Sequence, residues 1–233
     1  MMARRGVLGL LAGGAVALLS ACNPFGGNGY RFRMTVEVET PEGLKTGSSV
    51  YEVRAERDIK LSPDMGNAHT SIRGEAIAVD LPGGKTLFAL LKTVAGAGRD
   101  DLPYMSMKTF DPAYNNKSVE SAQRISSGNG IRSPADVAEG DYPMLVTFTD
   151  IDDPTSVQRV DPANLAASFG PGIRLKRITV EVTDDDVTTG IEKRLGWLHS
   201  ITGKNLDGSN LYDINAPLNA QLNSGDFRRG LKE

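Results

Sequence analysis

GEAIAVDLPGGKTLFALLKT, residues 74–93, has the pattern of two apolar strands joined by a turn. The turn composition lies at Pro82–Lys85, with Gly74–Leu81 before it and Thr86–Thr93 after it. Both faces of the predicted hairpin are largely apolar, which favours a position inside a sheet that is covered on each side. We therefore expect this hairpin to form the centre of the fold.

The register of the central hairpin depends on where its turn is centred. A helix over Thr86–Lys92 is the competing interpretation, but the run is short and follows a Gly-Gly turn. The prediction buries Ile77 and Leu90. Centring the turn on the two glycines gives these cross-strand pairs: Val79 with Phe88, Ile77 with Leu90, Ala76 with Leu91 and Glu75 with Lys92.

An amphipathic hairpin is predicted upstream of the central one. Residues Tyr30–Glu39 alternate between apolar and polar, which is typical of a half-buried strand. The run Thr46–Glu56 is also β-rich, and the Thr40–Leu44 segment between them has turn chemistry. A two-residue turn at Glu42-Gly43 predicts these pairs: Phe32 with Val53, Met34 with Tyr51 and Arg33 with Glu52.

The second half of the chain contains further strand patterns. They cover Pro143–Asp150, Ser156–Val160 and Ile173–Thr183. In the last run the apolar alternation changes phase between Leu175 and Ile178, which predicts a bulge at Lys176-Arg177.

Helical patterns are fewer than strand patterns. Apolar spacing or capping residues indicate four segments: Lys117–Ile125, about two turns opened by Asp161-Pro162 and stopped by Gly170, a helix capped by Thr188 or Thr189 with Ile191, Leu195 and Leu198 on one stripe, and a weak run over Leu218–Leu222. We predict a β-rich α+β fold, a mostly antiparallel sheet or sandwich of about six or seven strands with two or three packed helices. Residues 30–233 would form one domain with an irregular insertion at about 94–143.

That insertion is the candidate partner or ligand site. It is too rich in apolar and aromatic residues for a solvated coil, so we expect a loop that docks on the sheet and forms one wall of the site. Sealing of the core is the alternative role for the same side chains. The candidate contact residues are Tyr104, Met105, Met107, Phe110 and Tyr114.

Catalytic signals are weak. The sequence has no G-x-S-x-G elbow, and neither His69 nor His199 lies near a strand-to-helix serine turn. A glycosidase would need two facing carboxylates, which sequence alone cannot pair. We predict no catalytic residues and no cofactor; a hydrolase using carboxylate or Ser/His chemistry is the alternative.

Three acidic clusters have oxygen ligands of the kind that calcium prefers. Asp150, Asp152 and Asp153 are weak metal candidates. The run Asp184–Asp186 precedes a predicted helix, where negative charge is favoured by the helix dipole. The run Asn205–Ser209 lacks the glutamate that an EF-hand loop requires, so we predict no metal site.

The N-terminus resembles the signal of bacterial lipoproteins. A basic head at Met1–Arg5 precedes the apolar run Gly6–Leu19, and Leu19-Ser20-Ala21-Cys22 resembles a lipobox. The resemblance implies cleavage of residues 1–21, diacylglycerol on the Cys22 sulfur, and acylation, with palmitate for example, of the new amino terminus. Residues 22–29 would then be a short tether, and several acyl chains would hold the protein on a membrane.

The location within the envelope follows from the same resemblance. In Gram-negative lipoproteins the residue after the lipidated cysteine influences sorting, and Asn23 is not the aspartate associated with inner-membrane retention. The expected location is therefore the outer membrane, facing the periplasm. Arg4-Arg5 partly resembles a twin-arginine signal, which leaves the export route open.

Charge and cysteine content exclude several classes. Removal of residues 1–21 would leave 24 basic against 29 acidic residues, a net charge of −5, which is no footprint for nucleic acid. Cys22 is the only cysteine, so its lipidation would leave no thiol for a disulfide or a zinc site.

Three segments of the mature region resemble uncharacterised proteobacterial lipoproteins, a resemblance that implies no activity: Thr183–Leu198, Pro154–Val157 and Asp161–Gly172. Together with the missing catalytic signatures, this favours a non-catalytic envelope protein that binds an envelope partner or helps an assembly. An exposed apolar patch without a convergent titratable cleft would favour binding, and the reverse would favour an enzyme.

Overall fold

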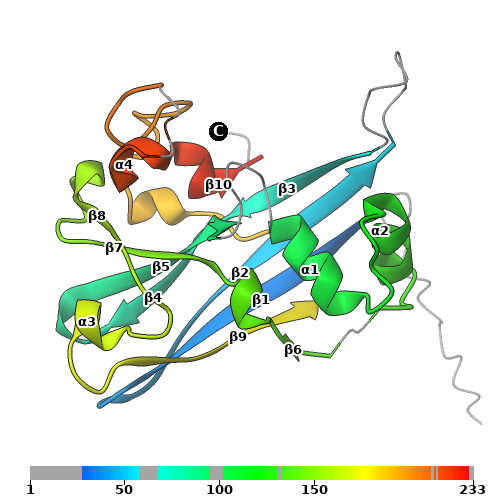
Figure 1. The fold of residues 1–233 in the computed structure, drawn as a ribbon, viewed down its shortest axis with the longest axis horizontal. Coiled ribbons are helices and arrows are strands. Elements are labelled where there is room, and N and C mark those ends of the chain that lie inside the picture. Colours follow the sequence, from blue (N-terminus) through cyan, green and yellow to red (C-terminus); the bar gives the residue numbers. More distant parts are fainter. Residues whose placement is uncertain are drawn as a thin grey trace, which may run out of the picture.

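The computed structural model describes residues 28–57, 68–94, 102–130, 133–210, 213 and 215–230. These residues form a β-rich α+β fold with two antiparallel sheets, one of six strands and one of four (Figure 1). The predicted fold class is confirmed. The described strands outnumber the predicted ones partly because β6 and β10 have only two residues each and carry no periodic pattern.

The larger sheet has the strand order β10-β3-β2-β1-β9-β6. In that order its strands are Arg228–Arg229, His69–Glu75, Gly43–Glu56, Gly29–Thr40, Arg174–Val182 and Ala135–Asp136. The apolar side chains of β1 are buried on one face, as the alternation predicts. The predicted bulge in β9 is also confirmed, because the β1 register shifts from Arg177 to Leu175 and leaves Lys176 unpaired.

The predicted register of the β1–β2 hairpin is wrong by two residues. Phe32 lies opposite Tyr51, and Arg31 rather than Arg33 lies opposite Glu52. The loop between the strands consists of Pro41 and Glu42. The Thr40 hydroxyl stabilises it, accepting from the Glu42 amide and donating to the Gly43 carbonyl. Gly43 has a φ of 111°, which a side chain would disfavour. A shift of two residues keeps every side chain on its predicted face.

The smaller sheet has the order β4-β5-β7-β8. Its strands are Ile77–Leu81, Lys85–Thr93, Pro143–Phe148 and Val157–Arg159. The predicted strand Gly74–Leu81 is in fact divided at Ala76, where the chain passes from the larger sheet to the smaller. The predicted pairs are wrong by one residue, since Ile77 lies opposite Ala89. The connection is the three-residue 3-10 turn Pro82–Gly84 rather than a turn centred on two glycines.

The predicted position inside a covered sheet is confirmed for β5 but wrong for β4, which is an edge strand of the smaller sheet. The β5 residues Leu87–Leu91 are all buried, so both faces of the strand are covered. On one side Phe88 meets Phe148 and Phe227 in edge contacts, and Phe227 brings the C-terminal segment over the sheet. On the other side the smaller sheet packs against β2, where Gly47 lies close to Ile77 and Ala78.

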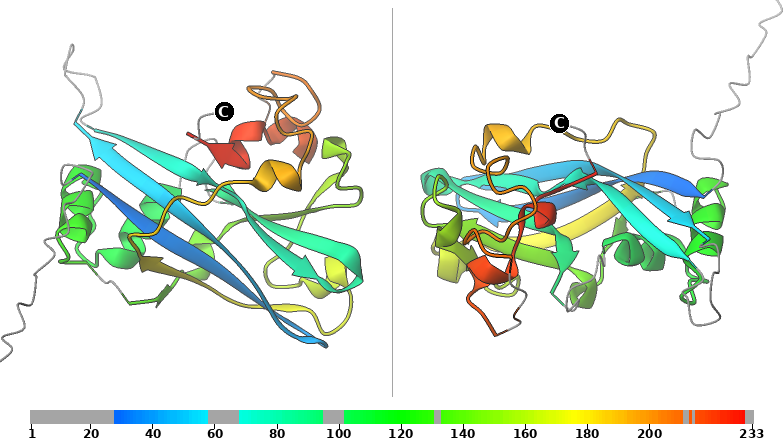
Figure 2. Two further views of the ribbon diagram at one scale, coloured as in Figure 1. Left: turned by 180° about the vertical axis from the view of Figure 1, so that it is seen from behind. Right: turned by 90° about the horizontal axis from the view of Figure 1, so that it is seen from above.

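Two nine-residue helices cover the rest of the apolar face of the larger sheet. Helix α1, Leu102–Phe110, and α2, Ser118–Ser126, lie over one end of β1 and β2, while the smaller sheet lies toward the other end (Figures 1 and 2). Helix α2 confirms the predicted segment Lys117–Ile125. Both sheets and both helices contribute to one hydrophobic cluster.

The remaining helical predictions have mixed outcomes. The run Leu218–Gln221 is helix α4, as predicted, whereas α3 covers only Ala166–Phe169 before Gly170 stops it. The predicted helix after Thr188 is wrong. Ile191–Lys193 is a single 3-10 turn followed by further turns, although Leu195 and Leu198 are buried as its apolar stripe requires.

The segment 183–190 that follows β9 crosses the face of the larger sheet opposite α1 and α2 (Figure 2, right). Its end is fixed on β2, where the Val50 amide donates to the Thr188 hydroxyl at 2.9 Å and the Thr188 amide donates to the Val50 carbonyl at 3.2 Å. We call this segment the strap.

Candidate functional site

The predicted irregular insertion contains a helix that the sequence analysis missed. Helix α1 starts with Leu102-Pro103, and proline is well tolerated in the first turn of a helix. Most of its residues are buried, so the helix lacks the one-sided apolar stripe that would have revealed it. The expectation of a loop here is therefore wrong.

The five predicted contact residues fall into two groups. Met105, Met107 and Phe110 are fully buried, and the Phe110 ring meets Tyr30 edge-on at 6.1 Å. These three seal the core and offer no surface to a partner. Tyr104 and Tyr114 are half-buried and are the members of the predicted set that reach the surface.

A groove of about 520 Å³ lies where the connections of the smaller sheet meet. Its lining comes from three separate parts of the chain: Val94, Glu139, Gly140 and Tyr142, and Arg159–Pro162. Val94 has an exposed fraction of 51%, and among the described residues only Leu44, at 49%, is another large apolar residue so exposed. We call this the apolar groove.

The sheet topology explains why these three parts come together. Val94 follows the last residue of β5, and Thr93 pairs with Pro143 at the start of β7. Val160 follows the end of β8, and its amide donates to the Leu145 carbonyl of β7 at 2.9 Å. In an antiparallel sheet the end of one strand lies beside the start of the next. All three connections therefore meet at the same end of the strands.

The groove is fixed to helix α1 by an ion pair. Lys108 Nζ lies 2.7 Å from Asp141 Oδ1, and Asp141 belongs to the 3-10 turn Glu139–Asp141 beside the groove. The predicted contact segment and the groove are therefore neighbours. No sequence pattern predicts the groove itself, because its lining residues are far apart in the chain.

Charged groups stand among the apolar lining. Glu139, Asp161 and Arg159 are exposed. The Arg159 guanidinium is 3.8 Å from the Met144 sulfur. Burial raises the pKa of the Tyr142 hydroxyl, and the carboxylates of Glu139 and Asp136 raise it further, which indicates a negative potential at this ring.

A second hollow, of about 560 Å³, lies at the other end of the strands of the smaller sheet, where β5 starts and β7 ends. Its aromatic lining is Phe88 and Phe148, whose ring centroids are 5.6 Å apart. Asp150 is the only carboxylate among the described residues that line it. A glycosidase mechanism needs two facing carboxylates, so the described lining does not supply that chemistry.

The weak metal candidates serve as turn formers. Asp150 Oδ1 accepts from the Asp152 amide at 3.0 Å, and Asp153 Oδ1 accepts from the Thr155 amide at 2.8 Å. No group of three or more His, Cys, Asp or Glu side chains that could hold a metal occurs in the described part of the chain. The two histidines lie on different elements, His69 at the start of β3 and His199 in the turns after Ile191–Lys193.

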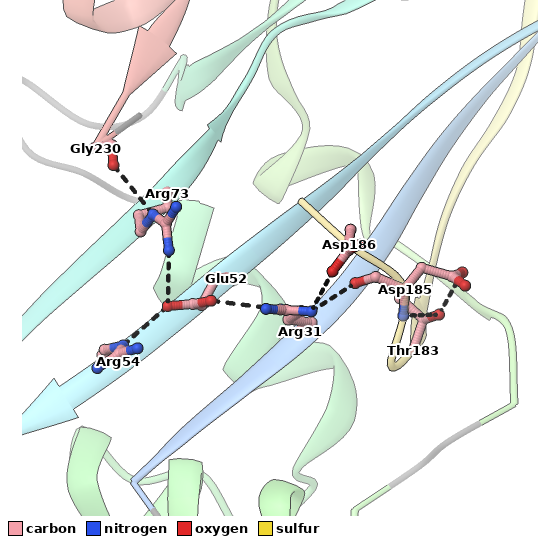
Figure 3. Close-up of polar contacts among 8 residues, drawn as sticks. All are labelled: Arg31, Glu52, Arg54, Arg73, Thr183, Asp185, Asp186 and Gly230. Atoms are coloured by element: carbon pink, nitrogen blue, oxygen red, sulfur yellow. Dashed lines mark hydrogen bonds and ion pairs between the residues drawn. The ribbon is translucent and has the colours of Figure 1, made fainter. Parts of the chain in front are cut away.

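A charged network covers the outer face of the larger sheet (Figure 3). Glu52 has an exposed fraction of only 1%, and its carboxylate lies 3.4 Å from Arg31, 2.9 Å from Arg54 and 3.5 Å from Arg73. Arg73 also donates to the Gly230 carbonyl at 3.0 Å. All these contacts are internal to the fold, so we assign the network a structural role.

The network also holds the strap. Arg31 donates to the Asp185 carbonyl at 3.1 Å and pairs with Asp186 at 3.3 Å (Figure 3). The Arg33 guanidinium contacts the Asp185 carboxylate. The expectation that Asp184–Asp186 serve a helix dipole is wrong, because the next described element is the 3-10 turn Ile191–Lys193 rather than an α-helix, and Asp185 and Asp186 face arginines of β1 instead.

Comparisons with known proteins add no family: no family model, curated protein or solved structure matches this chain. Among the described helices, none has the length and apolar character needed to cross a membrane. Cys22, the predicted lipidation site, lies outside the described residues.

Proposed function

We propose that this protein is a lipid-anchored protein of the bacterial cell envelope that binds an envelope protein without catalysis, through the apolar groove. The observation that carries the proposal is the groove itself. In it Val94 is half exposed at the end of the smaller sheet where three strand connections meet. Beside Val94 the groove presents the half-buried Tyr142 ring and Pro162, and apolar surface that is gathered in a concave site marks interaction surfaces more often than isolated apolar side chains do.

The arrangement of titratable groups supports binding rather than hydrolysis. The histidines occupy separate elements, and the Asp150 and Asp153 carboxylates accept backbone hydrogen bonds in turns. A hydrolase would require a nucleophile or acid with its base within hydrogen-bond reach. The apolar groove holds two carboxylates, Glu139 and Asp161, but both are exposed and neither bonds to another side chain of the described residues. The periplasmic hydrolase is therefore the weaker candidate.

Crosslinking in intact cells tests the proposed binding surface. A photoreactive residue placed at Val94 should give a discrete crosslinked protein adduct after irradiation. The same residue at Leu44 is the matched control, since Leu44 is equally exposed but lies at the β1–β2 turn. Equal adduct yields at both positions, or none at Val94, would count against the groove.

The anchor is tested separately at Cys22, the only cysteine of the chain. Cys22→Ser should give an uncleaved precursor without lipid, because the sulfur is the acyl acceptor that the lipoprotein signal provides. Mass spectrometry of the wild-type protein should show a processed, acylated amino terminus. An unmodified thiol on Cys22 would remove the anchor from the proposal and leave the groove untouched.

A further inference from the structure

Resting on the proposed function, we infer that the apolar groove takes a basic, apolar segment of its protein partner, with aliphatic or aromatic side chains in the groove and lysine or arginine beside them. Complementary apolar surface and complementary charge are what such a segment would recognise.

The wall of the groove is mostly apolar. Val94 and Pro162 expose only hydrocarbon, the buried Val160 lies beneath them, and Tyr142 adds a half-buried ring. The volume of about 520 Å³ falls within the range of about 300–1,000 Å³ that is typical of ligand pockets. A wall of this kind favours apolar side chains over a charged small molecule.

The carboxylates of Glu139 and Asp161 give the groove negative charge. Neither is in an ion pair with a side chain of the described residues. Asp161 Oδ1 accepts only a local hydrogen bond, from the Ala163 amide at 2.9 Å. An exposed carboxylate at the border of an apolar surface attracts a partner cation and disfavours a partner anion.

The other charged groups around the groove do not cancel this preference. Arg159 is the one cation among the described lining residues, and it stands beside Met144 rather than beside either carboxylate. The Lys108 ammonium is already paired with Asp141. Asp136, which acts on Tyr142 through space, adds a further negative charge. The groove therefore has an excess of carboxylate.

The test uses the full-length protein in zwitterionic lipid nanodiscs and fluorescein-labelled octapeptides as probes. One probe carries leucine and phenylalanine between lysines. The second replaces each lysine by glutamate, and the third keeps the lysines but replaces the apolar residues by serine. Fluorescence anisotropy, with empty nanodiscs subtracted, should show saturable binding of the first probe only, and added salt should weaken it.

The matched variants locate the charge. Glu139→Gln with Asp161→Asn removes both carboxylates of the groove while the Asn oxygen can still accept from the Ala163 amide. This pair should weaken binding of the basic apolar probe by about tenfold, which corresponds to about 1.4 kcal/mol. Asp152→Asn with Asp184→Asn removes two exposed carboxylates outside the groove lining and should leave the affinity unchanged.

Several results would overturn the inference: no binding of the basic apolar probe, equal binding of the acidic probe, or equal weakening by the two double variants. The Val94 crosslink reports any protein partner, whatever its charge. A partner adduct at Val94 combined with failure of the basic probe would thus refute this inference while the proposed function stands.

Discussion

Gly47 of β2 lies directly against the Ala78 carbonyl of β4, so that a Cβ on Gly47 would overlap this oxygen. The same Cβ would also come within 2.9 Å of Ile77 Cγ2. The two sheets therefore approach each other closely at a residue that has no side chain. Because backbone cannot move aside as a flexible side chain can, only glycine fits this position.

We expect Gly47→Ala to lower the free energy of unfolding by about 1–3 kcal/mol, as overpacking of a dense interior does. The backbone angle plays no part, since Gly47 is not among the glycines with positive φ. Gly196→Ala is the control, because a Cβ there meets nothing within 4 Å. Equal urea midpoints for Gly47→Ala and the wild type would show that the sheets separate easily.

The central hairpin makes a second prediction. Ile77 and Leu90 have exposed fractions of 1% and 0%. Truncation of either to alanine should cost about 2–5 kcal/mol, because it leaves a cavity in packed surroundings. Chemical denaturation gives the measurement. Unchanged midpoints in both variants would place the hairpin at the periphery, contrary to the structure.

Helix α1 allows a comparison within one element. Phe110→Ala should cost about 3–5 kcal/mol, since its ring packs on Tyr30 and Phe32 in the core. Tyr104→Ala, at a half-buried site, should change stability less. The yield of the Val94 crosslink in Phe110→Ala should fall only in proportion to the fraction of folded protein. That result would support the core role of Phe110. A selective loss in Tyr104→Ala would extend the binding surface onto α1.

Glu75 should make stability fall as the pH rises. Burial raises the pKa of its carboxyl above the ordinary value of 4.5, against the lowering effect of the hydrogen bond from the Ile191 amide. The folded state therefore favours the protonated form, and its contribution is present below pH 4.5 and lost as the pH passes the folded-state pKa. Glu75→Gln should lose less stability than the wild type between pH 4.5 and neutrality.

Glu37 provides a control of opposite sign. A hydrogen bond from Arg177, at 2.8 Å, and the ion pair with Lys176, at 2.9 Å, lower the pKa of its carboxyl below 4.5. Its contribution is present above pH 4.5 and lost as the pH falls through the folded-state pKa. Glu37→Gln should thus be less stable than the wild type at neutrality and approach it in acid. The assignments fail if both variants show the same pH dependence.

The elements that the sequence predicted well are those with a local signal. The alternation of β1 is sufficient to identify its buried face, because side chains of a strand point to opposite sides in turn. The phase change near Lys176 identified the bulge of β9, and the spacing in Ser118–Ser126 identified α2. Helix α1 was missed because burial on several sides removes the helical periodicity.

The sequence predicted only part of the candidate site. The sequence singled out the aromatic and methionine cluster Tyr104–Tyr114, yet three of its five candidates are buried in the core. The Lys108–Asp141 ion pair shows that the cluster and the groove are neighbours. A search for clusters along the chain cannot find a groove whose wall comes from residues 94, 139–142 and 159–162.

The sequence by itself determined the β-rich α+β class, the faces of the amphipathic strands and the burial of Ile77 and Leu90, since these follow from local periodicity and composition. Only the tertiary structure decided the registers, the passage of the chain between sheets at Ala76, and the apolar groove. The physical reason is that periodicity specifies which side chains share a face, whereas register depends on turn geometry, and a groove depends on which distant connections meet.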